Sequence, residues 1–402
     1  MKMSMITKRM LMSTDDQKRN YYCSQKFWWL SVDVDRSQTL SCCAASPENI
    51  DVKWLVDNPG QLFNSPKLQQ ERSDMLQNIP VSSCAQTCWN AEDLGLPSRR
   101  TLMKSNHLAH QNLNSDVETL HILLGNDCNM SCVYCCKQYS SSWARDIMNH
   151  GPYQVNTSDD RYLINAMDKI LIKLSQKEIA NSQRRNFILE EIYKLDKKNL
   201  KEVTITGGEP FLNLSLQSLV DSLDPAVHTF VWSGLGVDPS RFRQECKKIK
   251  RSNLEIVVSV ENIEHFYEFN RNGNTWKRFC QNIDILDELE IKYSFNSTVS
   301  NLTLFGLPEF FRWAGNRKIS WGICNDPKFL SPHVIDEGTK KYIIDHLSIF
   351  PEKLQKLLIE SFDTVATPDS ISDLKSFLGE FAKRQSKFLD IFPKHFLDWI
   401  KD

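Results

Sequence analysis

Residues 118–135 have the sequence ETLHILLGNDCNMSCVYC, in which an apolar run leads into three closely spaced cysteines. The run over residues 118–124 predicts a buried strand, and the Gly-Asn pair after it predicts the end of that strand. The loop that carries Cys128, Cys132 and Cys135 therefore follows the carboxyl end of a strand. Parallel α/β folds place their chemistry at this end of their strands.

The spacing of these cysteines indicates a reactive metal centre. Soft thiolates at such short intervals suit iron–sulfur or zinc, and a set of three leaves one metal position of a cubane cluster open. A structural zinc ion normally takes four protein ligands, and the adjacent Cys136 would have to be the fourth. Because the side chains of neighbouring cysteines diverge, we expect Cys136 to be a small buried hydrophobe instead.

A glycine-rich turn follows the next predicted strand. Residues 202–206 (EVTIT) are rich in β-branched side chains and lead into the sequence GGEP. Gly207 and Gly208 let backbone groups approach a ligand closely, and Glu209 adds a carboxylate beside them. Taken alone, the same residues are more typical of an ordinary strand-to-helix turn.

Together the two motifs resemble the signature of the radical S-adenosylmethionine (radical SAM) superfamily. The cysteine spacing, with the aromatic Tyr134 before the last cysteine, looks like the cluster loop of that family. The resemblance implies that the three cysteines hold a [4Fe–4S] cluster and that the Gly-Gly-Glu turn binds the amino group of SAM. It also implies that SAM is cleaved to methionine and a 5′-deoxyadenosyl radical, which abstracts hydrogen from an unreactive C–H bond.

Residues 117–325 alternate predicted strands and helices, a pattern typical of an α/β fold with a parallel sheet. The predicted strands are 118–124, 202–206, 227–232, 254–260, 291–298 and 319–323, and the predicted helices are 158–180, 185–197, 239–251, 263–287 and 303–315. The resemblance implies a partial (β/α)6 TIM-like barrel, which is an open relative of the eight-stranded barrel. The first crossover is long, and we expect its charged part, residues 176–201, to be an exposed helical insertion.

Two further strand ends carry residues that resemble SAM-contacting positions of the family. Ser233 lies where the family often has a Thr-Asn-Gly-like strand end, and Ser259 lies in a segment like its Ser-x-Asp strand end. In the second segment Glu261 stands in place of the usual aspartate. A capping or turn role is the alternative for both serines. Arg271 would either bind a carboxylate or pack a loop, and we expect packing.

A second group of cysteines lies near the N-terminus. The alternating pattern over residues 27–34 and the polar turn after it predict a hairpin that brings Cys23 towards Cys42 or Cys43. A helix over residues 66–78 would then carry the chain to the last pair of the group, Cys84 and Cys88. Four such positions supply a closed site with four thiolate ligands.

This N-terminal stretch resembles the SPASM/twitch auxiliary-cluster module of radical SAM enzymes. The shared features are the first cysteine, an aromatic strand, a Cys-Cys pair, an Asn-Ser before a helix and a closing cysteine pair. The module usually follows the barrel, whereas here it precedes it, and its closing pair is spaced by three residues instead of the commoner two. The resemblance implies a second iron–sulfur cluster on Cys23, Cys42, Cys84 and Cys88, with Cys43 as the alternative to Cys42. A structural zinc knuckle is the alternative to this cluster.

The composition is that of an ordinary globular protein with one unusual feature, its twelve cysteines. The 402 residues carry 49 basic and 50 acidic side chains, and a net charge of −1 does not favour a global nucleic-acid binder, although a local basic groove stays open. No apolar run approaches the roughly 18 residues of a membrane span, and no signal-peptide core begins the chain. We therefore expect a cytoplasmic protein without membrane contact, because clustered thiols in a reducing compartment more often bind metal than form disulfides.

These patterns divide the chain into a flexible N-terminus at 1–20, a Cys-rich module at 21–95, a barrel at 116–325 and a helical extension at 326–402. In the extension, the helical spacing predicts helices over 342–358, 371–381 and 388–400.

We expect a radical SAM enzyme whose substrate is a peptide, a protein or a small molecule. By the resemblance, its electron donor is a flavodoxin- or ferredoxin-like protein. The alternatives are radical SAM modification of a nucleotide or RNA and a non-catalytic metal-binding scaffold.

Overall fold

The computed structural model describes residues 20–102, 112–156, 178–385, 387 and 389–401. The predicted flexible segment 1–20 lies outside these residues except for Asn20, and so does the predicted helix 158–180 except for its last turn.

Nine strands form one mixed sheet in the order β3-β2-β1-β4-β5-β6-β7-β8-β9. Their bounds are β1 Trp29–Asp33, β2 Gln38–Leu40, β3 Glu48–Asn49, β4 Thr119–Leu123, β5 Glu202–Thr206, β6 His228–Ser233, β7 Leu254–Ser259, β8 Lys292–Val299 and β9 Ile319–Ile323. The strands β4 to β9 are parallel neighbours in chain order. Since β3 and β9 end the order and do not pair in the described chain, the sheet is open. The predicted α/β fold with a partial (β/α)6 TIM-like barrel is confirmed.

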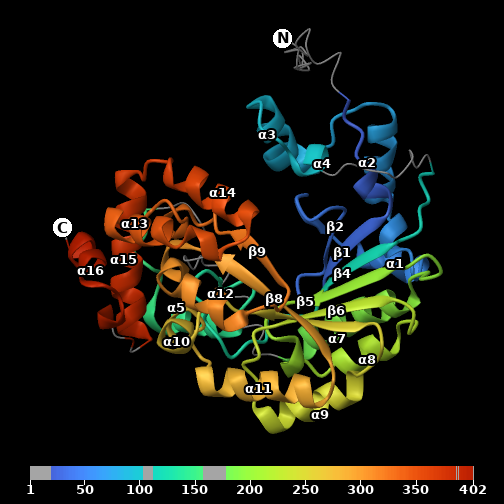
Figure 1. The fold of residues 1–402 in the computed structure, drawn as a ribbon. Helices are drawn as coiled ribbons and strands as arrows, with labels where there is room; N and C mark the ends of the chain where they lie inside the picture. Colours follow the sequence, from blue (N-terminus) through green and yellow to red (C-terminus); the bar gives the residue numbers. More distant parts are fainter. Residues whose placement is uncertain (1–19, 103–111, 157–177, 386, 388, 402) are drawn as a thin grey trace, which may run out of the picture.

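Helices surround this sheet (Figure 1). Before and within the barrel they are α1 Val52–Asp57, α2 Pro66–Leu76, α3 Asn90–Asp93, α4 Arg99–Leu102, α5 Ser141–His150, α7 Glu178–Lys194, α8 Leu216–Asp221, α9 Pro239–Ile249, α10 Glu264–Asn270, α11 Trp276–Glu288 and α12 Leu307–Ala314. One large apolar core unites the buried residues of β4 to β8 with those of α7, α8, α9, α11 and α12. On the opposite face, the alternate residues of β4 and β5 stay half-exposed. The pleat therefore gives the sheet one dry face and one accessible face.

Helix α7 corrects the prediction of an exposed insertion over 176–201. Ile188 and Ile192 are fully buried in the main core, one helical turn apart. Glu191 is fully buried as well, and its carboxylate accepts a hydrogen bond of 2.6 Å from the N–H of Gly60. The prediction was wrong because the many charges of the segment hide an apolar i, i+4 stripe that faces the sheet.

The N-terminal hairpin extends the barrel sheet. β1 pairs antiparallel with β2, which places Ser31 opposite Leu40, and it pairs parallel with β4, which places Ser31 opposite His121. Residues just before β1 and just after β2 therefore lie at the amino end of β4, whereas the Cys128 loop follows its carboxyl end. The five residues of β1 separate these two ends by about 16 Å.

The C-terminal helices are α13 Glu337–Asp345, α14 Glu352–Phe362, α15 Pro368–Arg384 and α16 Lys394–Lys401. They gather on one side of the molecule, whereas α2, α3 and α4 lie at the other end of the sheet (Figure 1). The predicted helix 342–358 is two helices in the structure. α13 ends at Asp345, and α14 begins after Pro351, its N-cap residue, since proline does not fit inside a helix. A second apolar core joins α15 and α16 to α5 and to Val133 of the cysteine loop. No helix of the described residues is long and apolar enough to cross a membrane.

Candidate functional site

The three cysteines after β4 lie together in a buried loop. Cys128 and Cys132 form a buried cluster with Met130, and Cys135 packs against it. Burial raises the pKa of Cys128 to about 12, and the neighbouring Cys132 and Glu209 add to the effect. Burial and the nearby Glu261 carboxylate raise the pKa of Cys132. For Cys135, a hydrogen bond with Cys136 is the largest cause of the raised pKa, followed by burial and the neighbouring thiols. Crowded thiols that oppose one another's ionisation are ready ligands for a cationic metal centre, since metal binding displaces their protons.

The turn after β5 holds one side of this loop. The N–H of Gly208 donates to the carbonyl of Gly125 at 2.8 Å, and the N–H of Glu209 donates to that of Asp127 at 2.7 Å. A Cβ atom at Gly207 would lie 2.4 Å from the oxygen of Gly125, and one at Gly208 would lie 2.3 Å from the oxygen of Asp127. Both glycines are thus required for the turn to meet the cysteine loop, backbone against backbone.

The first turn of α5 holds a second side. Ser140 donates its hydroxyl proton to the carbonyl of Met130 at 2.6 Å and also caps the helix by accepting from the N–H of Trp143. The hydroxyl groups of Ser141 and Ser142 both donate to the carbonyl of Cys128, at 3.0 and 2.8 Å. The indole of Trp143 donates to the carbonyl of Cys132 at 2.8 Å.

A loop between α10 and α11 holds the third side and corrects the prediction of one continuous helix over 263–287. The N–H of Ser131 donates to the carbonyl of Asn272 at 2.8 Å, and that of Val133 donates to the carbonyl of Asn270 at 3.0 Å. Gly273 in this loop has a φ of 99°, and a Cβ atom there would lie 2.4 Å from the oxygen of Asn129. The cysteine loop is therefore fixed from three directions.

The α10–α11 loop also carries Arg271, which we expected only to pack. Its buried guanidinium forms a two-pronged ion pair with Glu261, and its Nη1 donates to the Sγ of Cys132 at 3.6 Å. The guanidinium carbon also lies 5.2 Å from the ring centre of Tyr134. Arg271 lowers the pKa of Cys132, against the larger effect of burial. The structure thus gives Glu261 a place, as the partner of a cation that contacts a cysteine sulfur.

Glu209 and Ser233 are bound to each other. The Glu209 carboxylate accepts from the Ser233 hydroxyl at 2.8 and 3.0 Å and from the N–H of Gly234 at 3.1 Å. The Ser233 oxygen in turn accepts from the N–H of Leu235 at 2.9 Å. Burial raises the pKa of Glu209 to about 7, although these hydrogen bonds work in the opposite direction. Ser259 is half-buried at the end of β7, opposite Asn296 of β8, on the accessible face of the sheet.

A comparison with protein families matches residues 122–310 to the radical SAM superfamily. These residues are therefore similar to a radical SAM domain. The match begins within β4 and ends within α12, so it contains the cysteine loop, the Gly-Gly-Glu turn and the Arg271 loop. The protein is therefore an enzyme, and the family implies a [4Fe–4S] cluster and SAM as its cofactors.

Comparisons with individual proteins give more distant similarities. The chain is 24% identical over 217 residues to L-seryl-tRNA(Sec) selenium transferase of Campylobacter lari, over 48% of this chain and 45% of that protein. It thus spans less than half the length of this curated relative. SAM-bound SuiB of Streptococcus suis is 16% identical over 79% of this chain and 68% of its own, with a TM-score of 0.34. AdoMet-bound anSMEcpe is 13% identical over 52% of both chains, with a TM-score of 0.32.

Outside residues 122–310, the N-terminal cysteines also come together. Cys23, Cys84 and Cys88 belong to one small buried cluster with Trp89, and Cys88 lies in a single π-helical turn. Burial raises the pKa of Cys23 and of Cys84, and the Cys88 thiol adds to the increase in both. The Sγ of buried Cys42 donates to Oε1 of Gln25 at 3.2 Å. The pKa of Cys42 is raised chiefly by a hydrogen bond with Cys43 and by burial, and the Cys23 thiol adds to the increase.

Cys43, which follows Cys42 in the sequence, has a different environment. Cys43 is exposed, and its pKa is lowered to about 6, chiefly by the hydrogen bond with Cys42 and also by the nearby Arg99. Within the described residues, no three His, Cys, Asp or Glu side chains converge on one position for a single metal ion at either site. The thiolates of a cubane bind different irons and need no such convergence.

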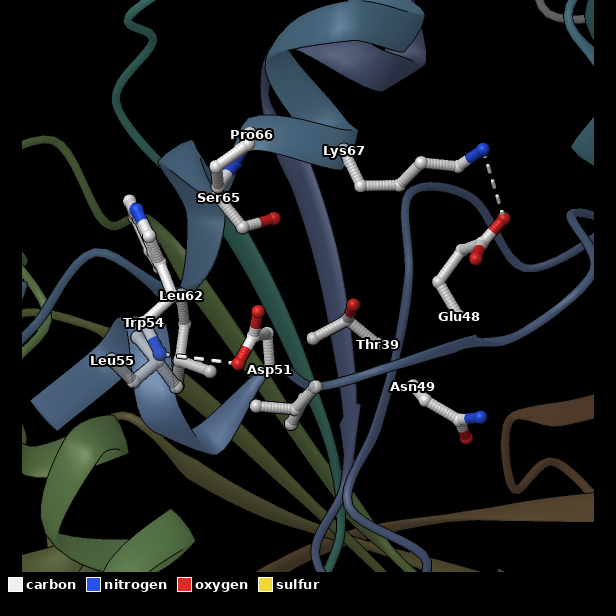
Figure 2. A pocket seen from close by; sticks show the side chains of 11 residues that line it. Thr39, Glu48, Asn49, Asp51, Trp54, Leu55, Leu62, Ser65, Pro66 and Lys67 are labelled. Carbon is white, nitrogen blue, oxygen red and sulfur yellow. Dashed lines mark hydrogen bonds and ion pairs between the residues drawn. The ribbon is translucent and has the colours of Figure 1, made fainter.

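A pocket lies at the β2–β3 edge of the sheet, between these strands and the helices α1 and α2 (Figure 2). Lys67 and Glu48 form an ion pair of 3.6 Å beside it, and Asp51 accepts from the N–H of Trp54 at 3.1 Å within it. None of its described lining residues is a cysteine or lies within residues 122–310. The pocket is therefore separate from both groups of cysteines.

Proposed function

We propose that Cys128, Cys132 and Cys135 are the ligands of the [4Fe–4S] cluster of a radical SAM enzyme. The observation that carries this proposal is the geometry of their loop, which places three crowded, protonated thiols at the carboxyl end of β4 and fixes the backbone from three sides. The donor set is soft and one ligand short of a closed site, which fits a cluster with an open iron.

When bound, the cluster and SAM supply the one-electron cleavage that yields methionine and a 5′-deoxyadenosyl radical. The chain supplies the frame. Gly207, Gly208 and Glu209 are proposed to orient SAM beside the open iron, and Ser233 and Ser259 to line its place. Since Ser233 already holds the carboxylate of Glu209, its role would be to fix that side chain. The buried walls of the loop keep water away from the reactive species.

We also propose a second iron–sulfur cluster on Cys23, Cys42, Cys84 and Cys88. Support comes from the resemblance to the SPASM/twitch module and from the burial of these four thiols near one another. Cys42 is favoured over Cys43, because Cys42 is buried and interacts with Cys23, whereas Cys43 is exposed.

The proposed substrate is a peptide or protein, in keeping with the resemblance of the N-terminal module. The accessible face of the sheet carries polar groups that suit such a ligand, since half-buried His121 and Thr206 are hydrogen-bonded there at 2.7 Å. Buried Ser31 orients the ring of His121 from the other side at 3.0 Å. A flavodoxin- or ferredoxin-like protein is proposed as the electron donor. We propose the cytoplasm as the compartment, since all twelve cysteines are free thiols. A net charge of −1 does not favour an RNA substrate.

The test is the production of 5′-deoxyadenosine by anaerobically reconstituted, reduced protein. Replacing Cys132 by alanine is expected to abolish this product. Cys246→Ala, which alters a fully buried core thiol on α9, is the matched control and is expected to retain it. Undiminished 5′-deoxyadenosine from the Cys132→Ala protein would contradict the ligand assignment.

A further inference from the structure

A buried lysine lies at the centre of the N-terminal cysteine region. The side chain of Lys26 is 1% exposed and that of Glu71 is 3% exposed. All three ammonium protons of Lys26 are used, because its Nζ donates to Glu71 at 2.7 Å, to Ser41 at 2.6 Å and to Ser83 at 2.9 Å. A buried ion pair is costly unless its hydrogen bonds are complete, and this one meets that condition.

The two serines close the network. Ser41 donates its hydroxyl proton to Oε2 of Glu71 at 2.7 Å, and Ser83 donates to Oε1 at 2.5 Å. Each serine therefore bridges the ammonium group and the carboxylate. We call these four residues, Lys26, Glu71, Ser41 and Ser83, the lysine hub.

The lysine hub joins every segment that carries a proposed ligand of the second cluster. Lys26 lies in the short 3₁₀ helix Ser24–Phe27, for which Cys23 is the N-cap. Ser41 directly precedes Cys42, and Ser83 directly precedes Cys84, while Glu71 projects from α2. Three chain segments that are remote in sequence are thus held to one ammonium group.

The charges of the hub also lie beside the thiols, because Ser41 and Ser83, which bond both the ammonium group and the carboxylate, each directly precede a proposed cysteine ligand. The next residue on α2, Arg72, is fully buried too, so the hub and Arg72 together bring a net charge of +1 into this region.

We propose that Lys26, held by Glu71, is a positioning residue that preorganises the four-cysteine site and raises the reduction potential of the cluster bound there. This inference rests on the proposed second cluster. Reduction adds one electron to an anionic cluster, and a fixed cation nearby stabilises the reduced form, since net charge and hydrogen bonding set the potential of such centres. A glutamate at the same place has the opposite effect.

The test is an EPR-monitored potentiometric titration of the reconstituted full chain with dithionite as reductant. Lys26→Met is expected to lower the midpoint potential of the second cluster, and Glu71→Gln is expected to raise it. The double variant Lys26→Met/Glu71→Met removes both charges and is expected to lie between the two single variants. Lys194→Met is the matched control, since Lys194 pairs with buried Glu191 at 2.9 Å on α7, a helix that carries no cysteine.

Opposite shifts from the two single variants support the proposal, because a merely structural defect would not change sign with the charge that is removed. If the Lys26→Met protein loses the second cluster but still cleaves SAM, the positioning role of Lys26 is supported. The midpoint potential of the second cluster in the Glu71→Gln protein then tests the effect of charge. Equal potentials in wild type and Glu71→Gln would overturn the inference alone. If Cys84→Ala/Cys88→Ala leaves the iron content unchanged, the second cluster itself is absent. The proposed second cluster and the proposed role of Lys26 are then both refuted.

Discussion

The two groups of cysteines lie at opposite ends of one sheet and are held in different ways. The loop of Cys128, Cys132 and Cys135 is fixed at its own backbone, which is bonded to backbone groups beside Gly208 and Gly273 and to side chains in the first turn of α5. The N-terminal cysteines are fixed through side chains, by the lysine hub beneath them.

This difference follows from what each proposed cluster must do. A cluster that binds SAM at an open iron needs free space on one side, and backbone contacts fix the loop without filling that space with side chains. A cluster with four protein ligands needs no such space, and buried side chains can surround it completely. The comparison therefore predicts that the first site depends on glycines and that the second depends on charges.

The largest expected effect separates the two sites by their metal content. In Cys84→Ala/Cys88→Ala protein, iron and sulfide are expected to fall to about four of each per chain, the content of a single [4Fe–4S] cluster. The remaining cluster should still cleave SAM, because its ligands lie at the other end of the sheet. Unchanged iron and sulfide after anaerobic reconstitution would refute the second cluster, and zinc without sulfide would favour a zinc knuckle.

The second prediction tests the dependence of the first site on glycine. Gly208→Ala would place a Cβ atom 2.3 Å from the oxygen of Asp127, so the turn must move away from the cysteine loop. We expect the first cluster to be lost on gel filtration and the free energy of unfolding to fall by about 1–3 kcal/mol.

Gly379→Ala is the control for this substitution. Gly379 lies inside α15, and nothing lies within 4 Å of the added atom. Alanine there is expected to stabilise the helix by up to about 1 kcal/mol and to leave iron content unchanged. A Gly208→Ala protein that keeps both its iron and its stability would show that the close contact does not matter.

The third prediction concerns the pH dependence of stability. The pKa of Glu209 is raised from 4.5 to about 7 in the folded protein, so the folded state holds a proton that the unfolded state loses first. Its contribution is fully present below about pH 4.5 and is lost as the pH rises through 7, a change of about 3 kcal/mol. Glu209→Gln should therefore give a flatter profile in urea unfolding between pH 5 and 8. A variant profile as steep as that of Glu337→Gln, an exposed carboxyl on α13, would contradict this account.

The sequence predicted the elements whose signals are local. The six barrel strands fall within a residue or two of their predicted bounds, because each is a short segment that contains several β-branched or aromatic residues. The Gly-Gly-Glu turn was also evident, although the sequence suggested only an approach to a ligand. The structure adds that these glycines first allow the approach of another loop.

Contacts between remote segments had no such signal. Arg271 lies 139 residues from Cys132 in the sequence, and Glu71 lies 45 residues from Lys26. Their pairing depends on the sheet order, in which β1 adds to the barrel beside β4, and no local pattern predicts that order. The break at Pro351, by contrast, was a local signal that the helical spacing concealed.

The most direct test of the central claim is whether SAM changes the EPR spectrum of each reduced cluster in isolation. The Cys84→Ala/Cys88→Ala protein retains only the proposed three-cysteine cluster, and SAM is expected to alter its spectrum by binding the open iron. The Cys132→Ala protein retains only the four-cysteine cluster, and SAM is expected to leave its spectrum unchanged. A spectrum that responds to SAM in the Cys132→Ala protein, or fails to respond in the other, would contradict the account.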